Sequence, residues 1–158
     1  MSIVVEDRLV RLLGVPGGGR TSFAMAQAAA DLRGPEGRQL LLFDTLGHGS
    51  GQVPERDDLA ARTMFRTETL ARDVLAISRH LVSTGAVGCL VIDDAPGLDF
   101  EADLDRAARA KAMTNFSQSL GSIAYAHNCR VILIDRAGDR LERAPLGFRD
   151  YLVPGMAA

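Results

Sequence analysis

From residue 14 the chain carries the stretch Gly14-Val15-Pro16-Gly17-Gly18-Gly19-Arg20-Thr21, followed by Ser22. It is close to the pattern G-x-x-x-x-G-K-[ST], in which glycines let backbone N–H groups surround a phosphate. In that pattern a lysine reaches the β- and γ-phosphates, and a hydroxyl binds Mg²⁺. The expected backbone and hydroxyl ligands are present: Gly14, Gly17, Gly18, Gly19, Thr21 and Ser22. The lysine position holds Arg20, whose guanidinium keeps the charge but is planar and bulky.

The flanking residues favour a phosphate-binding loop over an ordinary glycine-rich turn. Leu9–Leu13 is a short, mostly apolar run typical of a strand, and the Ala-rich segment Ser22–Leu32 predicts a helix that ends at Gly34-Pro35. Strand, glycine loop and helix is the arrangement that the motif requires. A plain turn between a strand and a helix is the alternative.

Buried strands alternate with helices along the rest of the chain. The apolar runs are Leu9–Leu13, Leu40–Phe43, Cys89–Ile92 and Arg130–Ile134, and the helices are predicted over Ser22–Leu32, Glu68–Val82 and Leu104–His127. Continuous apolar runs separated by helices indicate a parallel sheet covered on both faces. We therefore predict an α/β fold, a three-layer open parallel sheet, in one domain over residues 1–158. Leu9–Leu13 is expected to lie beside Arg130–Ile134, and 47–56 is expected to be a mobile loop.

A second motif ends the apolar run Cys89–Ile92 with Asp93. An acid at the carboxyl end of a buried strand is the Walker B pattern, which holds the Mg²⁺ shell beside the phosphate loop. Because parallel strands end at one edge of the sheet, Asp93 is expected to meet Thr21 there. A solvated acidic turn is the alternative, and the same two interpretations apply to Asp135-Arg136 after the run Arg130–Ile134.

Composition excludes several classes of protein. The formal net charge is −2, so no global basic field indicates nucleic acid binding. No apolar run is long enough to span a membrane and no secretory signal is present, so we expect a cytoplasmic protein without membrane contact. Cys89 and Cys129 are predicted to be small core residues. Lys111 is the only lysine, so a general exchange of lysine for arginine explains Arg20 equally well.

Taken together, these motifs resemble a shortened RecA-like core, as found in recombinases and DnaB-type hexameric helicases. The resemblance rests on segment 14–25, on Leu40–Asp44, on Arg79–Asp94 and on Ser117–Ala124 ahead of the strand Arg130–Ile134. It implies ATP and Mg²⁺ as cofactors, with Thr21 and Asp93 as metal ligands and Arg136 at the position of the family's sensor glutamine. It also implies a basic DNA-facing loop near Asp139–Pro145.

The departures from the family concern catalysis. Leu46 stands where the resemblance implies a water-activating glutamate, so Asp44 or Glu55 would have to replace it, and the chain stops before further strands. We therefore expect Arg20, Asp44 and Asp93 to form a weak catalytic set. The favoured interpretation is an ATP-binding protein with weak or no hydrolysis that serves DNA processing as a regulatory or assembly partner.

Three alternatives remain open: a working ATPase of the helicase or recombinase type, an interaction module without nucleotide, and a small-molecule kinase. A homo-oligomer, or a hetero-oligomer with a related ATPase, is expected because RecA-type surfaces assemble head to tail. DNA contact is expected, if anywhere, at four arginines: Arg136, Arg140, Arg143 and Arg149. The other interpretation of these arginines is a solvated tail that pairs with Asp135, Asp139, Glu142 and Asp150.

Overall fold

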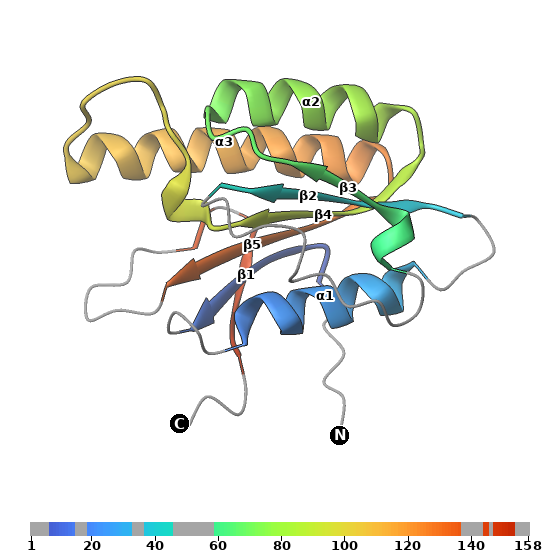
Figure 1. The fold of residues 1–158 in the computed structure, drawn as a ribbon. Coiled ribbons are helices and arrows are strands. Elements are labelled where there is room, and N and C mark those ends of the chain that lie inside the picture. The colour runs from blue at the N-terminus through green and yellow to red at the C-terminus, as the bar shows by residue number, and fades with distance from the viewer. Residues whose placement is uncertain are drawn as a thin grey trace.

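A six-stranded sheet organises the computed structural model, which describes residues 7–14, 19–32, 37–45, 59–136, 144–145 and 147–153. The strands are β1 (Leu9–Gly14), β2 (Gln39–Asp44), β3 (Thr63–Arg66), β4 (Val87–Asp93), β5 (Arg130–Arg136) and β6 (Arg149–Leu152). Their order is β3-β2-β4-β5-β1-β6, and all the pairings are parallel. The carboxyl ends of the strands therefore lie along one edge (Figure 1).

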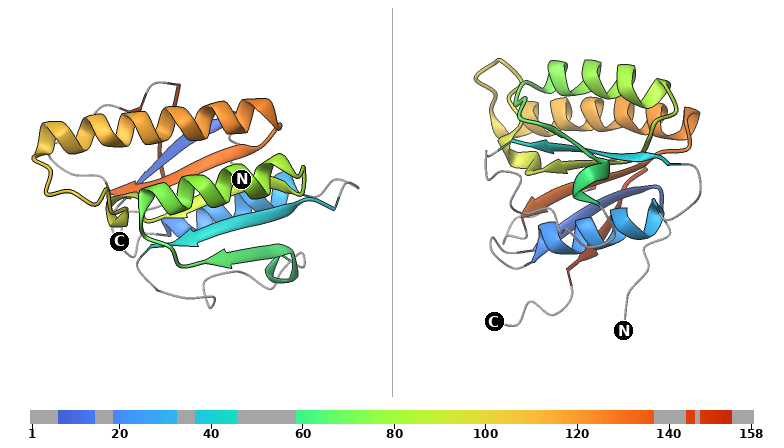
Figure 2. Two further views of the ribbon diagram at one scale, coloured as in Figure 1. Left: turned by 90° about the horizontal axis from the view of Figure 1, so that it is seen from above. Right: turned by 45° about the vertical axis from the view of Figure 1, so that its right-hand side comes forward.

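Helices cover both faces of this sheet, as Figures 1 and 2 show. Helix α1 (Arg20–Asp31) lies on one face, and helices α2 (Ala71–Ser83) and α3 (Arg106–Ala126) lie side by side on the other. Because successive strand residues point to opposite faces, each strand contributes to two cores. In β1, Val10 and Leu12 pack with α1, whereas Leu9 packs in the core beneath α2 and α3.

The predicted parallel α/β sheet is confirmed, including the pairing of β1 with β5. The four strands expected from apolar runs form its centre, each extended by one to three residues. Two strands, β3 and β6, were not predicted. Both are edge strands with mostly half-buried or exposed residues, so they lack the continuous apolar run that marks a strand covered on both faces.

Two helices begin later than predicted. Helix α2 begins at Ala71 rather than at Glu68, because Thr69 and Leu70 pair with Asp99 instead. Helix α3 begins at Arg106, where the Asp105 carboxylate accepts a hydrogen bond from the N–H of Ala108 and caps the first turn.

The predicted loop over 47–56 lies outside the described residues. Among the residues that the structure describes, no helix has both the length and the apolar character needed to cross a membrane.

Candidate functional site

Alternation along the central strands gathers polar residues on one face of the carboxyl edge. Asp44, Asp93 and Arg136 end β2, β4 and β5, and Gly14 ends β1. Each lies an even number of positions from a strand residue that packs with α1, such as Leu42, Val91, Ile134 and Leu12. All four ends therefore belong to the α1 face.

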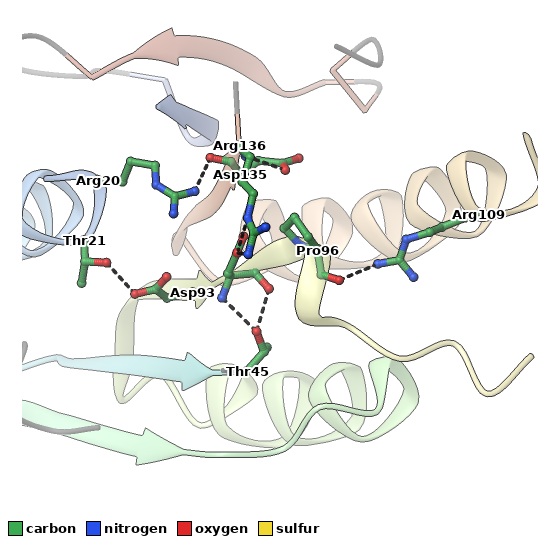
Figure 3. A network of polar contacts seen from close by, with 9 residues as sticks. Arg20, Thr21, Thr45, Asp93, Pro96, Arg109, Asp135 and Arg136 are labelled. Atoms are coloured by element: carbon green, nitrogen blue, oxygen red, sulfur yellow. Dashed lines mark hydrogen bonds and ion pairs between the residues drawn. The ribbon is translucent and has the colours of Figure 1, made fainter. Parts of the chain in front are cut away.

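Thr21 meets Asp93 at this edge, as the sequence predicts. The Thr21 hydroxyl donates a hydrogen bond to Asp93 Oδ2 at 2.6 Å (Figure 3). Gly19 precedes α1 with a φ of 88°, a left-handed conformation that glycine adopts without a Cβ penalty. This turn lets α1 begin at Arg20, so Thr21 and Ser22 occupy its first turn, where backbone N–H groups lack intrahelical partners and attract anions.

Arg20 lies across the end of β1 and contacts β5. Its Nη1 donates a hydrogen bond to the carbonyl oxygen of Asp135 at 2.6 Å, and the residue is 9% exposed. Its stem runs over Gly14, where an added Cβ would lie 2.9 Å from Arg20 Cγ. Gly14 is therefore needed for this close approach, and the arginine at the lysine position is held by a strand-end carbonyl.

Asp94 is a site residue that the sequence analysis missed. Its backbone is held by Thr45, whose hydroxyl donates to the carbonyl of Asp94 and accepts from its N–H. Its carboxylate pairs with Arg136, whose Nη2 lies 3.2 Å from Asp94 Oδ2, and the peptide bond between Asp93 and Asp94 is cis. Burial raises the pKa of Asp94, and the charges of Arg136 and Arg20 partly oppose that shift.

A second polar cluster, also missed, lies on the opposite face of the sheet. Arg11 of β1 is buried and donates to both carboxylate oxygens of Asp150 at 2.7 Å, and it lies 3.5 Å from Asp135 Oδ2. These ion pairs raise the pKa of Arg11, although burial acts against them. Two features of the sequence could have revealed this cluster. Arg11 stands in the middle of an apolar strand, and the alternation of side chains along β5 directs Asp135 and Arg136 to opposite faces of the sheet.

The described part of the arginine-rich tail pairs differently from the expectation. Asp135 and Asp150 bind Arg11, Arg136 binds Asp94, and Arg149 lies 3.9 Å from Asp7. Four of the residues named for this tail, and two of the loop glycines, lie outside the described residues: Asp139, Arg140, Glu142, Arg143, Gly17 and Gly18. Their roles stay predictions.

The donor set of the site fits Mg²⁺ bound together with a phosphate. Within the described ranges no three His, Cys, Asp or Glu side chains gather as a metal cage. Mg²⁺ does not need one, because it keeps several waters and binds one or two carboxylates plus phosphate oxygens. Thr21 and Asp93 are the two oxygen-bearing side chains that would hold such an ion, and here they are hydrogen-bonded to each other. Cys89 and Cys129 are free and buried, as predicted, and burial raises the pKa of the Cys129 thiol to about 12.

Comparison with known proteins adds no relative: neither a protein-family model nor a curated protein matches this chain.

Proposed function

We propose that this chain is a RecA-like protein that binds ATP with Mg²⁺ at the loop 14–21 and hydrolyses it weakly or not at all. In this proposal it acts as a regulatory or assembly partner in DNA processing, that is, replication, recombination or repair. The contact between Thr21 and Asp93 supports the proposal most strongly. A hydroxyl at the start of a helix and a carboxylate at a strand end are the two side chains that Mg²⁺ uses beside a bound phosphate.

The strand order adds support for the RecA-like part of the proposal. The strand before the loop, β1, pairs with β5, which in turn pairs with β4 and its terminal Asp93. The pairing of β1 with β5 is the one predicted from the alternation of buried runs and helices, and β5, which ends in Arg136, lies between the strand before the loop and the strand that ends in Asp93. We propose that Arg136 takes the position of the family's sensor residue.

Weak hydrolysis follows from the partners of the two arginines. The guanidinium of Arg20 is held by the carbonyl of Asp135, and Arg136 is held by Asp94. No glutamate occupies the position of Leu46 in the sequence. General-base catalysis contributes about 10²–10⁴-fold in rate, so its loss leaves only positioning and Mg²⁺ to act.

Calorimetric titration with Mg²⁺–ATP and Mg²⁺–ADP tests the binding. We expect saturable binding by the natural chain and an affinity about tenfold lower in Thr21→Ala, since a hydrogen bond to a charged group contributes roughly 1.5–3 kcal/mol. Ser122→Ala removes an exposed helical hydroxyl on α3 and serves as the matched control. Equal affinities in all three proteins, or no binding, would favour an interaction module that uses no nucleotide.

Restoring the family's residues tests the catalytic part. We expect turnover by the natural chain to be far below the roughly 1 s⁻¹ at which ordinary enzymes begin. Leu46→Glu should raise it, and the double variant with Arg20→Lys should raise it most. If the natural chain already reaches enzyme-like rates, the reading as a pseudo-ATPase is wrong.

The second candidate function, an active ATPase, is favoured by one observation. Asp44 ends β2 directly opposite Asp93 in the sheet register and lies on the same face. If the chain is an active enzyme, Asp44 is the carboxylate that would activate the attacking water in place of the missing glutamate. Asp44→Asn should then abolish turnover while leaving nucleotide affinity within about threefold.

A further inference from the structure

A cavity of about 540 Å³ lies on the face of the sheet opposite Thr21. Its floor is formed by Arg11, Leu133 and Asp135, which alternate with strand residues that pack with α1. The N-terminal half of α3, Ala95-Pro96 and Ala144-Pro145 complete its lining. Its size suits a small organic ligand, since such sites span roughly 300–1,000 Å³.

The cavity exists because the inner face of α3 changes character along its length. From Phe116 to Ala124 this face is buried against the sheet. One to three turns earlier the same face carries Arg106, Arg109, Ala110, Met113 and Thr114, all of which line the cavity. These positions follow the 3–4 spacing of one helix face. Small residues, such as Ala95 and Ala110, leave the space open.

The lining is apolar in its body and cationic at its rim. Arg106, Arg109 and Lys111 come from α3, and Asp135 is the one acid among the described lining residues. Arg109 is fixed: it donates a hydrogen bond to the carbonyl of Pro96 (Figure 3). It also donates to the carbonyl of Leu98, and its guanidinium carbon lies 5.2 Å from the centroid of the Phe100 ring. Arg106 and Lys111 are exposed, so their positive charges lie at the mouth of the cavity, where solvent reaches them.

We propose that this cavity binds a small organic anion with an apolar body, such as an aromatic sulfonate, carboxylate or phosphate ester. The apolar part lies against Ala110, Met113 and Leu133, and the anionic group faces the cations of α3. The site is separate from the proposed nucleotide loop, because it lies on the other face of the sheet.

The probe for this site is 8-anilinonaphthalene-1-sulfonate, which becomes fluorescent when it binds an apolar pocket. Without nucleotide or Mg²⁺, we expect the sulfonate to bind one saturable site on the natural chain. Its affinity should be at least about tenfold higher than that of the uncharged parent N-phenyl-1-naphthylamine. Ala110→Trp fills the cavity and should weaken binding by about tenfold or more. Ala76→Trp adds the same ring to an exposed position on α2 and should bind as the natural chain does.

Charge variants test the rim without altering the core. Lys111→Gln should weaken binding of the sulfonate about threefold and flatten its salt dependence, whereas Arg79→Gln, exposed on α2, should change neither. Circular dichroism melting confirms that each variant is folded.

Four results would overturn the proposal. Equal affinity for the uncharged parent would make the site merely apolar, and unchanged binding by folded Ala110→Trp would place the probe elsewhere. Competition by Mg²⁺–ATP that is lost in Thr21→Ala would move the probe to the nucleotide loop. Displacement by oligothymidylate at far lower concentration than by small sulfonates would make the cavity part of a nucleic-acid groove.

Discussion

At the scale of single residues, Asp94 is a buried acid whose carboxylate has, within the described part of the chain, a partner for only one of its two oxygens. It is 0% exposed, and its Oδ1 lacks a hydrogen-bond partner among the described residues, while Oδ2 accepts from Arg136. A buried acid with one unsatisfied oxygen favours its neutral form. The raised pKa of Asp94 therefore links the stability of this site to pH.

We predict that Asp94→Asn raises the free energy of unfolding at pH 7. The folded-state pKa of Asp94 lies above its unfolded value of about 3.9, so folding favours the protonated acid. The stabilisation from protonation is complete below the unfolded pKa and is lost as pH rises through the folded one. The benefit of asparagine should therefore shrink as pH falls to about 4.

Urea unfolding at the two pH values measures this difference. Asp103→Asn, at an exposed position ahead of α3, is the control and should change stability little at either pH. A loss of stability in Asp94→Asn at pH 7 would mean that the ion pair with Arg136 outweighs the burial of the acid.

Sequence patterns predicted part of the site at this scale. Thr21 and Asp93 could be predicted to lie together, because a phosphate-binding loop and an acid at the end of a strand are both expected at the carboxyl edge of a parallel sheet. Asp94 could not, since its position depends on Thr45 and Arg136, which belong to other strands or their ends. The cluster around Arg11 likewise depends on Asp150 in an edge strand that no apolar run announces.

At the scale of elements, Arg38 joins three of them at the amino edge of the sheet. It stands just before β2 and donates to the carbonyls of Gly85, Val87, His127 and Asn128. These carbonyls belong to the turn after α2, the start of β4 and the end of α3. One guanidinium thus provides hydrogen-bond donors to backbone carbonyl oxygens from several segments of the chain.

We predict that Arg38→Ala lowers the free energy of unfolding by about 2 kcal/mol, since each net hydrogen bond contributes roughly 0.5–1.5 kcal/mol. Arg38→Lys should recover less than half, because an ammonium lacks the planar fork that reaches several carbonyls. Chemical denaturation measures both. Arg72→Ala, on the exposed face of α2, should stay within about 0.5 kcal/mol of the natural chain.

The elements themselves were largely predictable. Four central strands and three helices follow from apolar runs and helical spacing because burial on both faces imposes those patterns. The edge strands β3 and β6 form through pairing with β2 and β1, and their own half-exposed residues carry no such pattern. The start of α2 was predicted too early for a related reason. Leu70 pairs with Asp99, which is distant in the sequence, so this contact leaves no local pattern from which the helix start could be predicted.

At the scale of the whole molecule, two arginines near the carboxyl end of the described chain, Arg136 and Arg149, are the candidates for contact with nucleic acid. Arg136 and Arg149 keep half or more of their side-chain surface exposed, and each has an acidic neighbour, Asp94 and Asp7 respectively. An exposed ion pair contributes little to stability. Arg149 can therefore leave the carboxylate of Asp7 and pair with a phosphate at low energetic cost.

We predict that oligothymidylate binds this chain with an affinity that falls linearly with the logarithm of salt concentration, because bound cations are released from the phosphates. Arg149→Gln should reduce the slope by about 0.7, the contribution of one phosphate contact on a single strand. Arg79→Gln is the control, and fluorescence anisotropy at several salt concentrations measures the slope. Absence of binding at low salt would support the solvated tail.

The pairing of β1 has a consequence for how the chain comes to fold. Its neighbours in the sheet are β5 and β6, the last two of the described strands, and Arg8 donates to the carbonyl of Cys129, 121 positions further along. During synthesis at about 5–20 residues per second, the apolar first strand waits for many seconds before its partners emerge. The sheet can close around β1 only after β5 and β6 have been synthesised, and non-local closure of this kind is slow. The nascent strand Leu9–Gly14 is therefore the segment for which a chaperone has the longest time to bind.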